Sequence, residues 1–336
     1  MNRITSMQSP ASVSQTMLMV LLALLPGVLI FVFQNGWGAV INISLAIFSA
    51  LAFEALAQKL RKRSALTALS DYSAVVTALL IALCLPPLIP WWIPVLASGI
   101  AILLAKHAFG GIGNNLFNPA MVGYAIVLIS FPADLSLWLQ QPVSMSVSFA
   151  ESLTAVFQGG LTAIPNWDAL TGATALDQHR TLVLQNNSTT DISLQTSGLF
   201  GARHSEWINL AYLAGGLWLL NKRVISWHIP LSFLSALLVV MLLHKLLHTA
   251  PLSVSVNLFG GATMLCAFFI STDPVSAAAS ARGRIIYGAL TGLLVYIIRT
   301  YGAYPDSIAF AVLLANCTVP AIDRFEIWLN RFADGK

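Results

Sequence analysis

Long apolar runs separated by short polar segments dominate this chain. The run MLMVLLALLPGVLIFVF, residues 17–33, contains no charged residue. A membrane-spanning helix needs about 20 mainly apolar residues. Because somewhat fewer residues suffice where a helix is short or broken, we predict ten spans, at about 16–34, 38–57, 71–89, 91–106, 119–132, 207–220, 228–247, 257–271, 284–300 and 306–320. Only 9% of all residues are charged, whereas about 25% is usual in soluble proteins. We therefore predict an all-α polytopic membrane protein.

One long polar region interrupts this pattern. Residues 133–206 contain NNSTTD, scattered glycine, serine and threonine, and no apolar run long enough to cross a membrane. The sequence therefore predicts three parts: a first transmembrane half of about five spans (1–132), an extramembrane insertion (133–206), and a second half of about five spans with a cytoplasmic tail (207–336). Residues 1–15 are polar and lack signal-peptide features, so we expect the first apolar run to be retained.

The basic residues predict how the chain is oriented. Four basic clusters, around residues 59–63, 222–223, 282–284 and 324–331, all follow even-numbered spans. Basic loops stay on the cytoplasmic side of bacterial membranes. Both termini are therefore predicted to be cytoplasmic, and the insertion to be periplasmic. The same clusters account for the basic pI of about 9.1, so nucleic acid is not an expected partner.

The two halves contain related sequences. ALLIALCLPPLIPWW (78–92) and MLCAFFISTDPVSAA (264–278) are both apolar runs that end at a proline-containing break. Each is followed by an octapeptide with a first glycine and a last cation, GIAILLAK (99–106) and GLLVYIIR (292–299). Paired breaks are typical of membrane folds built from repeats, in which broken helices line a central site. An odd number of spans per repeat makes the repeats inverted.

Several charged residues lie close to the breaks or to the ends of the spans. Asp273 precedes Pro274 at the second break, and Lys106 and Arg299 end the two octapeptides. For these residues a polar central site and a charge at the membrane boundary both remain open. Glu54 is interpreted as a helix-end residue near a basic cluster. Neither the three cysteines nor the scattered histidines predict a metal site.

A polar segment in the insertion, NWDALTGATALDQ (166–178), has a distinctive order of small and hydroxyl residues. An aspartate and two spacers precede a threonine, two minimal side chains and a second threonine, which would leave the last hydroxyl open to a modifying enzyme. A threonine-rich turn or helix cap explains the same pattern.

The heptad DALTGAT (168–174) resembles the Asp-x-x-Ser/Thr-Gly-Ala-Thr flavinylation motif. In that motif a transferase moves FMN from FAD onto the final threonine, through a phosphoester at Oγ. The resemblance implies that Thr174 is the attachment point, with the recognition context formed by Asp168, Thr171, Gly172 and Ala173. It implies no catalytic residue and no metal ligand.

Much of the remaining chain resembles one family. The segments GGIGNNLFNPAMVGYAIVLISFP, GATMLCAFFISTDPVSA, RGRIIYGALTGLLVYIIR and YPDSIAFAVLLANCTVPAID are similar to the RnfD family of the Rnf electron-transport complex, which is related to NqrB of the sodium-pumping NADH:quinone oxidoreductase. The resemblance extends from residue 20 to about Asp323. The C-terminal tail RFEIWLNRFADGK and the short insertion depart from the family pattern.

The resemblance implies an integral subunit of an ion-translocating oxidoreductase in the bacterial inner membrane. The complex would couple electron transfer between ferredoxin and NAD to sodium or proton movement, and the subunit would not be active alone. Implied partners are RnfA, RnfB, RnfC, RnfE, RnfG, a flavin transferase and the lipid bilayer. A second, non-covalent flavin such as riboflavin is open by analogy with NqrB, although no residue identifies its site.

A different class of function also remains open from the residues alone. The paired breaks and the Asp273-Pro274 pair suit a secondary transporter or channel without a redox cofactor. A covalent flavin, which fluoresces on a denaturing gel, would separate the two interpretations.

Overall fold

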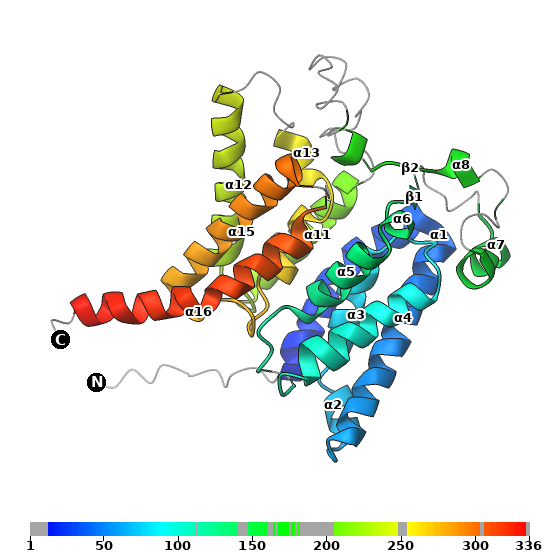
Figure 1. Cartoon of the computed structure of the whole chain (residues 1–336), viewed down its shortest axis with the longest axis horizontal. Coiled ribbons are helices and arrows are strands. Elements are labelled where there is room, and N and C mark those ends of the chain that lie inside the picture. Colours follow the sequence, from blue (N-terminus) through cyan, green and yellow to red (C-terminus); the bar gives the residue numbers. More distant parts are fainter. Residues whose placement is uncertain are drawn as a thin grey trace.

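The structure is a computed structural model that describes residues 13–111, 113–139, 147–159, 164, 167–174, 176–178, 181, 205–247, 254–302 and 306–333. Within these residues the chain is built almost entirely of helices, with one two-stranded sheet (Figure 1). The prediction of an all-α polytopic membrane protein is confirmed. The division into three parts at 132 and 206 stays a prediction.

The helices coincide with the ten predicted apolar segments. The first half contains α1 (Val13–Leu60), α2 (Ala65–Leu69), α3 (Ser73–Cys84), α4 (Trp92–Gly99), its π-helical continuation η1 (Ile100–His107) and α5 (Pro119–Ser130). The second half contains α11 (Ser205–Asn221), α12 (His228–Leu247), α13 (Val254–Phe259), α14 (Thr263–Leu265), its π-helical continuation η5 (Cys266–Ile270), α15 (Ala281–Tyr301) and α16 (Ile308–Ala333). Among the described helices, α1, α12, α15 and α16 are long and apolar enough to cross a membrane, and three further apolar helices are shorter.

The long helix α1 contains the first two predicted spans. Gly36 lies inside it with φ 66° and ψ −151°, a backbone conformation that is essentially restricted to glycine. Just before this point, the side chain of Asn35 donates to the carbonyl of Phe31 over 2.9 Å. The chain therefore reverses at Gly36, and the two parts of α1 form a helical hairpin (Figure 1).

Both predicted breaks are present, and an asparagine satisfies backbone carbonyls at each. Where α3 ends, Asn42 Nδ2 lies 3.4 Å from the carbonyl oxygens of both Ala82 and Pro86. Where η5 ends, Asn118 Nδ2 donates to the carbonyl of Ile270 over 3.1 Å. Because a helix end within a membrane protein cannot rely on water for its free carbonyls, such partners make a break possible at that depth.

The two halves repeat the same packing. The second part of α1 packs on α4 and η1, and α12 packs on α15 in the corresponding way. Between the halves, α1 packs on α11 and α5 packs on α16. Figure 1 shows the blue and cyan helices of the first half beside the yellow to red helices of the second.

The described elements of the insertion up to Gly172 pack on the first half. It contains α6 (Pro132–Leu135), β1 (Trp138–Leu139), α7 (Phe149–Thr154), η3 (Ala155–Gly159), α8 (Trp167–Leu170) and β2 (Thr171–Gly172). Buried Val156 and Ile164 form a small hydrophobic cluster with Ile41 of α1 and Leu88 after α3. This cluster anchors the insertion close to the first break.

Candidate functional site

The DALTGAT segment lies on a helical turn followed by a strand. The backbone of Asp168 belongs to α8, and its side chain lies outside the described part of the structure. Thr171 Oγ1 donates to the carbonyl of Trp167 over 3.1 Å, which closes the turn. Thr171 and Gly172 form β2, which pairs antiparallel with β1, with Trp138 opposite Gly172. The first part of the motif is therefore fixed by backbone pairing.

The side chain of Thr174 is half-buried and caps the next helical turn. Its hydroxyl donates to Asp177 Oδ2 over 2.7 Å, and the backbone N–H of Asp177 donates back to Oγ1 over 3.3 Å. Ala173, beside it, is exposed, and its carbonyl accepts from Gln178 Nε2 over 2.9 Å. The Thr174 hydroxyl is thus held at the start of a short turn, next to a carboxylate.

Leu176 fixes this turn to the second half of the molecule. Its side chain is 4% exposed and lies against Gly260 and Gly261, which separate α13 from α14. A Cβ atom built on Gly261 would lie 2.8 Å from Leu176 Cδ1, too close for a real contact, and Gly261 has a φ of 57°. Glycine adopts this left-handed conformation without strain and leaves room for the side chain of Leu176.

A buried arginine lies on the other side of the same glycine turn. The built Cβ of Gly261 would also lie 3.4 Å from Nη2 of Arg299, a side chain that is only 2% exposed. Arg299 Nη1 donates to the carbonyl of Asn257 over 2.7 Å, and Nη2 donates to Thr263 Oγ1 over 2.9 Å. Its Nε has no hydrogen-bond partner within the described structure. The guanidinium is therefore held by neutral partners.

Asp306, just before α16, completes the polar surroundings of the motif. A Cβ atom built on Gly261 would lie 3.8 Å from Asp306 Oδ1, so the carboxylate borders the same glycine turn as Arg299, although no ion pair within 4.0 Å joins the two side chains. Its Oδ1 has no hydrogen-bond partner among the described residues. Leu176, two residues after Thr174, thus meets Arg299 and Asp306 around Gly261, and we call this group the Thr174 cluster.

The corresponding cation of the first half has different surroundings. Lys106 is 3% exposed, and its Nζ lies 2.7 Å from Glu54 Oε2 and 2.9 Å from Ser73 Oγ. Glu54 also contacts His107 Nε2 at 2.9 Å. The interpretation of Glu54 as a helix-end residue is wrong, because Glu54 is 1% exposed and is the buried counterion of Lys106.

Asp273, at the second break, forms its own small network. Its Oδ2 accepts from Ser276 Oγ over 2.7 Å, and its Oδ1 accepts from the backbone N–H of Val275 over 3.4 Å. Asp273 is therefore satisfied by the loop that follows η5, and it is not part of the cluster around Thr174. Among the described residues no group of three or more metal-binding side chains exists.

The sequence pattern singles out the DALTGAT segment but does not predict which residues support it. Thr174 and Asp177 are three residues apart, a spacing that predicts a capping interaction at a helix start. No local pattern indicates that Leu176 contacts Gly261, 85 residues later in the chain. The sequence indicates Arg299 only as a boundary or central charge, and its position at the Gly261 turn comes from the fold alone.

Comparison with known proteins identifies the family of the chain. The model of the NQR2, RnfD, RnfE family matches residues 2–328. Three relatives, from Escherichia coli strains SMS-3-5, UMN026 and K12/DH10B, are each named as the D subunit of an ion-translocating oxidoreductase complex. Each is 46% identical over 325 residues, which is 93% of this chain and 92% of the relative. The chain therefore belongs to the NQR2, RnfD, RnfE family.

Proposed function

We propose that this chain is a membrane subunit of a redox-driven ion translocase and that it carries an FMN joined to Thr174 Oγ. Three observations support the proposal: the family, the name of the relatives, and the DALTGAT segment with its fixed threonine. The observation that carries it is the position of the Thr174 hydroxyl, half-buried and capped at the start of a turn.

The residues around Thr174 fit a group with a phosphodiester. Such a group carries one negative charge, and Arg299, on the same glycine turn as Leu176, supplies a buried positive charge that no carboxylate contacts directly. Oppositely charged groups at short range stabilise each other more strongly where water is excluded. Asp306 and Asp177 set the opposing negative charge, so the balance among these three side chains would tune the potential of the flavin.

The protein residues have distinct roles in this proposal. The FMN would supply the electron-transfer chemistry. The Asp177 carboxylate accepts a hydrogen bond from the Thr174 hydroxyl in the unmodified chain, and the Asp177 backbone N–H could still donate to Oγ1 once the phosphoester has formed. Leu176 and β2 hold the segment from two sides, so the attachment atom stays in one place.

The proposal extends to the setting of the subunit. We place it in the bacterial inner membrane, with the insertion on the periplasmic side and both termini in the cytoplasm, as the basic clusters predict. Electrons would pass between ferredoxin and NAD with RnfA, RnfB, RnfC, RnfE and RnfG, coupled to sodium or proton movement. A flavin transferase would attach FMN to Thr174, and the chain would be active only within the complex. A second, non-covalent flavin such as riboflavin remains part of the proposal without an assigned site.

One substitution tests the attachment. Thr174→Val keeps the shape of the side chain and removes the oxygen that a phosphoester needs. When the chain is produced with its transferase, the variant should insert normally but show no fluorescent band on a denaturing gel. The mass of the intact wild-type chain should exceed that of the variant by FMN less one water, after correction for the substitution.

Matched variants make the result specific. Thr171→Val removes the other hydroxyl of the motif and should retain flavin, at a lower yield. Thr174→Ser keeps a hydroxyl and should be modified in part. Flavin on Thr174→Val would place the attachment elsewhere, and a wild-type chain without flavin would favour a transporter or channel without a redox cofactor.

A further inference from the structure

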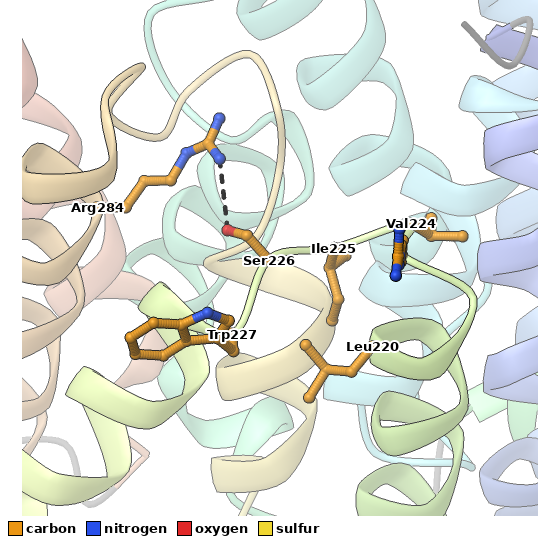
Figure 2. Close-up of a pocket in the computed structure, with 7 residues that line it drawn as sticks. Leu220, Val224, Ile225, Ser226, Trp227 and Arg284 are labelled. Carbon is orange, nitrogen blue, oxygen red and sulfur yellow. Dashed lines mark hydrogen bonds between the residues drawn. The ribbon is translucent and has the colours of Figure 1, made fainter. Parts of the chain in front are cut away.

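A cavity lies at the opposite end of the second half from the Thr174 cluster. It has a volume of about 580 Å³ and is bordered by the loop between α11 and α12 and by the first turn of α15 (Figure 2). The residues that line it are Leu220, Arg223, Val224, Ile225, Ser226, Trp227 and Arg284. Two cations, one hydroxyl and an apolar wall therefore meet in one place.

Neither arginine that lines the cavity has a carboxylate within ion-pair distance among the described residues. Arg284 donates from Nε to the carbonyl of Ala278 over 3.2 Å and from Nη1 to Ser226 Oγ over 3.4 Å, the bond drawn in Figure 2. The ion pairs found among the described residues involve Glu54 alone, so no carboxylate neutralises Arg223 or Arg284. Both positive charges thus remain available to an anion.

The backbone and the aromatic side chain shape the opening. Arg223 has a φ of 57°, a left-handed conformation that turns the chain sharply where α11 ends. Trp227 is 54% exposed and stacks on His228 with ring centroids 4.2 Å apart. Tryptophan is enriched where apolar and polar parts of a membrane meet. Leu220, Val224 and Ile225 supply the apolar wall beside the cations.

This combination matches one chemical class of ligand. A soluble anion needs the cations but has no use for an aliphatic wall or an exposed tryptophan, whereas a phospholipid uses all three. The cavity lies where α12 and α15 begin, and both helices are long and apolar enough to span a membrane. Arginine binds phosphate oxygens with two parallel hydrogen bonds, and basic pockets between membrane helices bind anionic lipid headgroups.

We propose that this cavity binds the phosphate headgroup of an anionic phospholipid in the leaflet predicted to be cytoplasmic. Arg223 and Arg284 contact the phosphate, Ser226 holds Arg284 toward it, and the first part of the acyl chains lies along Leu220, Val224 and Ile225. This inference does not depend on the flavin.

The test compares two double variants that remove the same charge. Arg223→Gln with Arg284→Gln empties the cavity of cations, while Lys222→Gln with Arg282→Gln removes two cations from the same clusters but outside the cavity lining. Each full-length chain is titrated in detergent with phosphatidylglycerol or with phosphatidylcholine of identical acyl chains. Native mass spectrometry then counts the bound lipid.

We expect the cavity variant to lose about 30-fold in affinity for phosphatidylglycerol, since each cation near an anionic lipid contributes about 1 kcal/mol. Its binding of phosphatidylcholine and the phosphatidylglycerol affinity of the control should change little. Brominated phosphatidylglycerol should also quench the wild-type fluorescence more than that of Trp227→Phe. Equal losses in both double variants would reduce the effect to general surface charge and overturn the proposal. Displacement of the lipid by excess inorganic phosphate or by riboflavin would also overturn it, in favour of a soluble anion or a flavin.

Discussion

Lys106 and Arg299 hold matching positions in the two halves but have different electrostatic surroundings. Each lies near the C-terminal end of the helix that follows a break, and each donates over 2.9 Å to a hydroxyl in the first turn of the broken helix, Ser73 for Lys106 and Thr263 for Arg299. Lys106 has Glu54 as a direct counterion at 2.7 Å. Arg299 has no counterion at this distance, and its Nη1 donates instead to the neutral backbone carbonyl of Asn257.

Lys106 therefore has a structural role, whereas the positive charge of Arg299 remains available to a negatively charged group nearby. The Lys106–Glu54 pair neutralises itself inside the protein, so its removal should affect stability. Arg299 keeps its charge next to the Thr174 segment, so changes around it should affect the flavin more than the fold. The predictions below test this separation, from the largest expected effect to the smallest.

The largest effect should come from breaking the pair in the first half. Glu54→Gln leaves Lys106 buried without a counterion, and the loss of one partner of a buried ion pair costs about 3–5 kcal/mol. We expect a clear fall in the midpoint of thermal unfolding in detergent. Adding Lys106→Met should restore much of the loss, because no uncompensated charge then remains. If the double variant is less stable than Glu54→Gln, Lys106 contributes to stability through contacts other than its ion pair with Glu54, which would contradict this account.

A smaller effect is expected at the glycine turn of the second half. Gly261→Ala adds a Cβ at a φ of 57° that would meet Leu176 at 2.8 Å. Left-handed backbone costs other residues roughly 1–2 kcal/mol, and the displaced Leu176 should also lower the yield of covalent flavin. Gly113→Ala is the control, because Gly113 has a φ of 90° and nothing within 4 Å of the added atom. Equal flavin yields in the two variants would argue against the role of Leu176.

Asp306→Asn should affect stability less than Glu54→Gln. Asp306 has no direct ion pair to lose, so we expect a change of about 1 kcal/mol or less in the free energy of unfolding. Removing its negative charge should instead raise the midpoint potential of the flavin proposed on Thr174, measured by a redox titration of the intact subunit. An unchanged potential together with a large loss of stability would mean that the two halves do not differ as described.

The smallest effect should lie in the insertion, outside both repeats. Ser148 and Glu151 form a capping box at the start of α7, and hydrogen bonds from the Ser148 backbone and hydroxyl lower the pKa of Glu151 below its usual 4.5. Because the folded pKa is lowered, the ionised Glu151 stabilises α7 fully at any pH above the ordinary pKa of a glutamate. This stabilisation is lost as the pH falls through the lower, folded pKa. Hydrogen exchange of α7, corrected for intrinsic rates, should show less protection in acid. Glu151→Gln should remove this pH dependence.

The sequence predicted the features that occur in both halves and those that depend only on residues close together in the chain. The two octapeptides ending in Lys106 and Arg299 placed both cations in equivalent positions, and the proline-containing runs located both breaks. The pairing of Glu54 with Lys106, 52 residues later, has no local signal, so the sequence alone places Glu54 at a helix end. The contact of Leu176 with Gly261 depends in the same way on how the insertion folds back onto the second half.

The two attachments of the Thr174 segment have a mechanical consequence. Gly172 is hydrogen-bonded into the strand pair beside the first half, and Leu176 is wedged against the glycine turn of the second. The few residues between them act as a short tether across the boundary of the two halves. If one half rotates against the other, this tether must bend or stretch, and Thr174 lies within it. The atom proposed to carry the cofactor therefore lies in a segment that relative motion of the two repeats would deform.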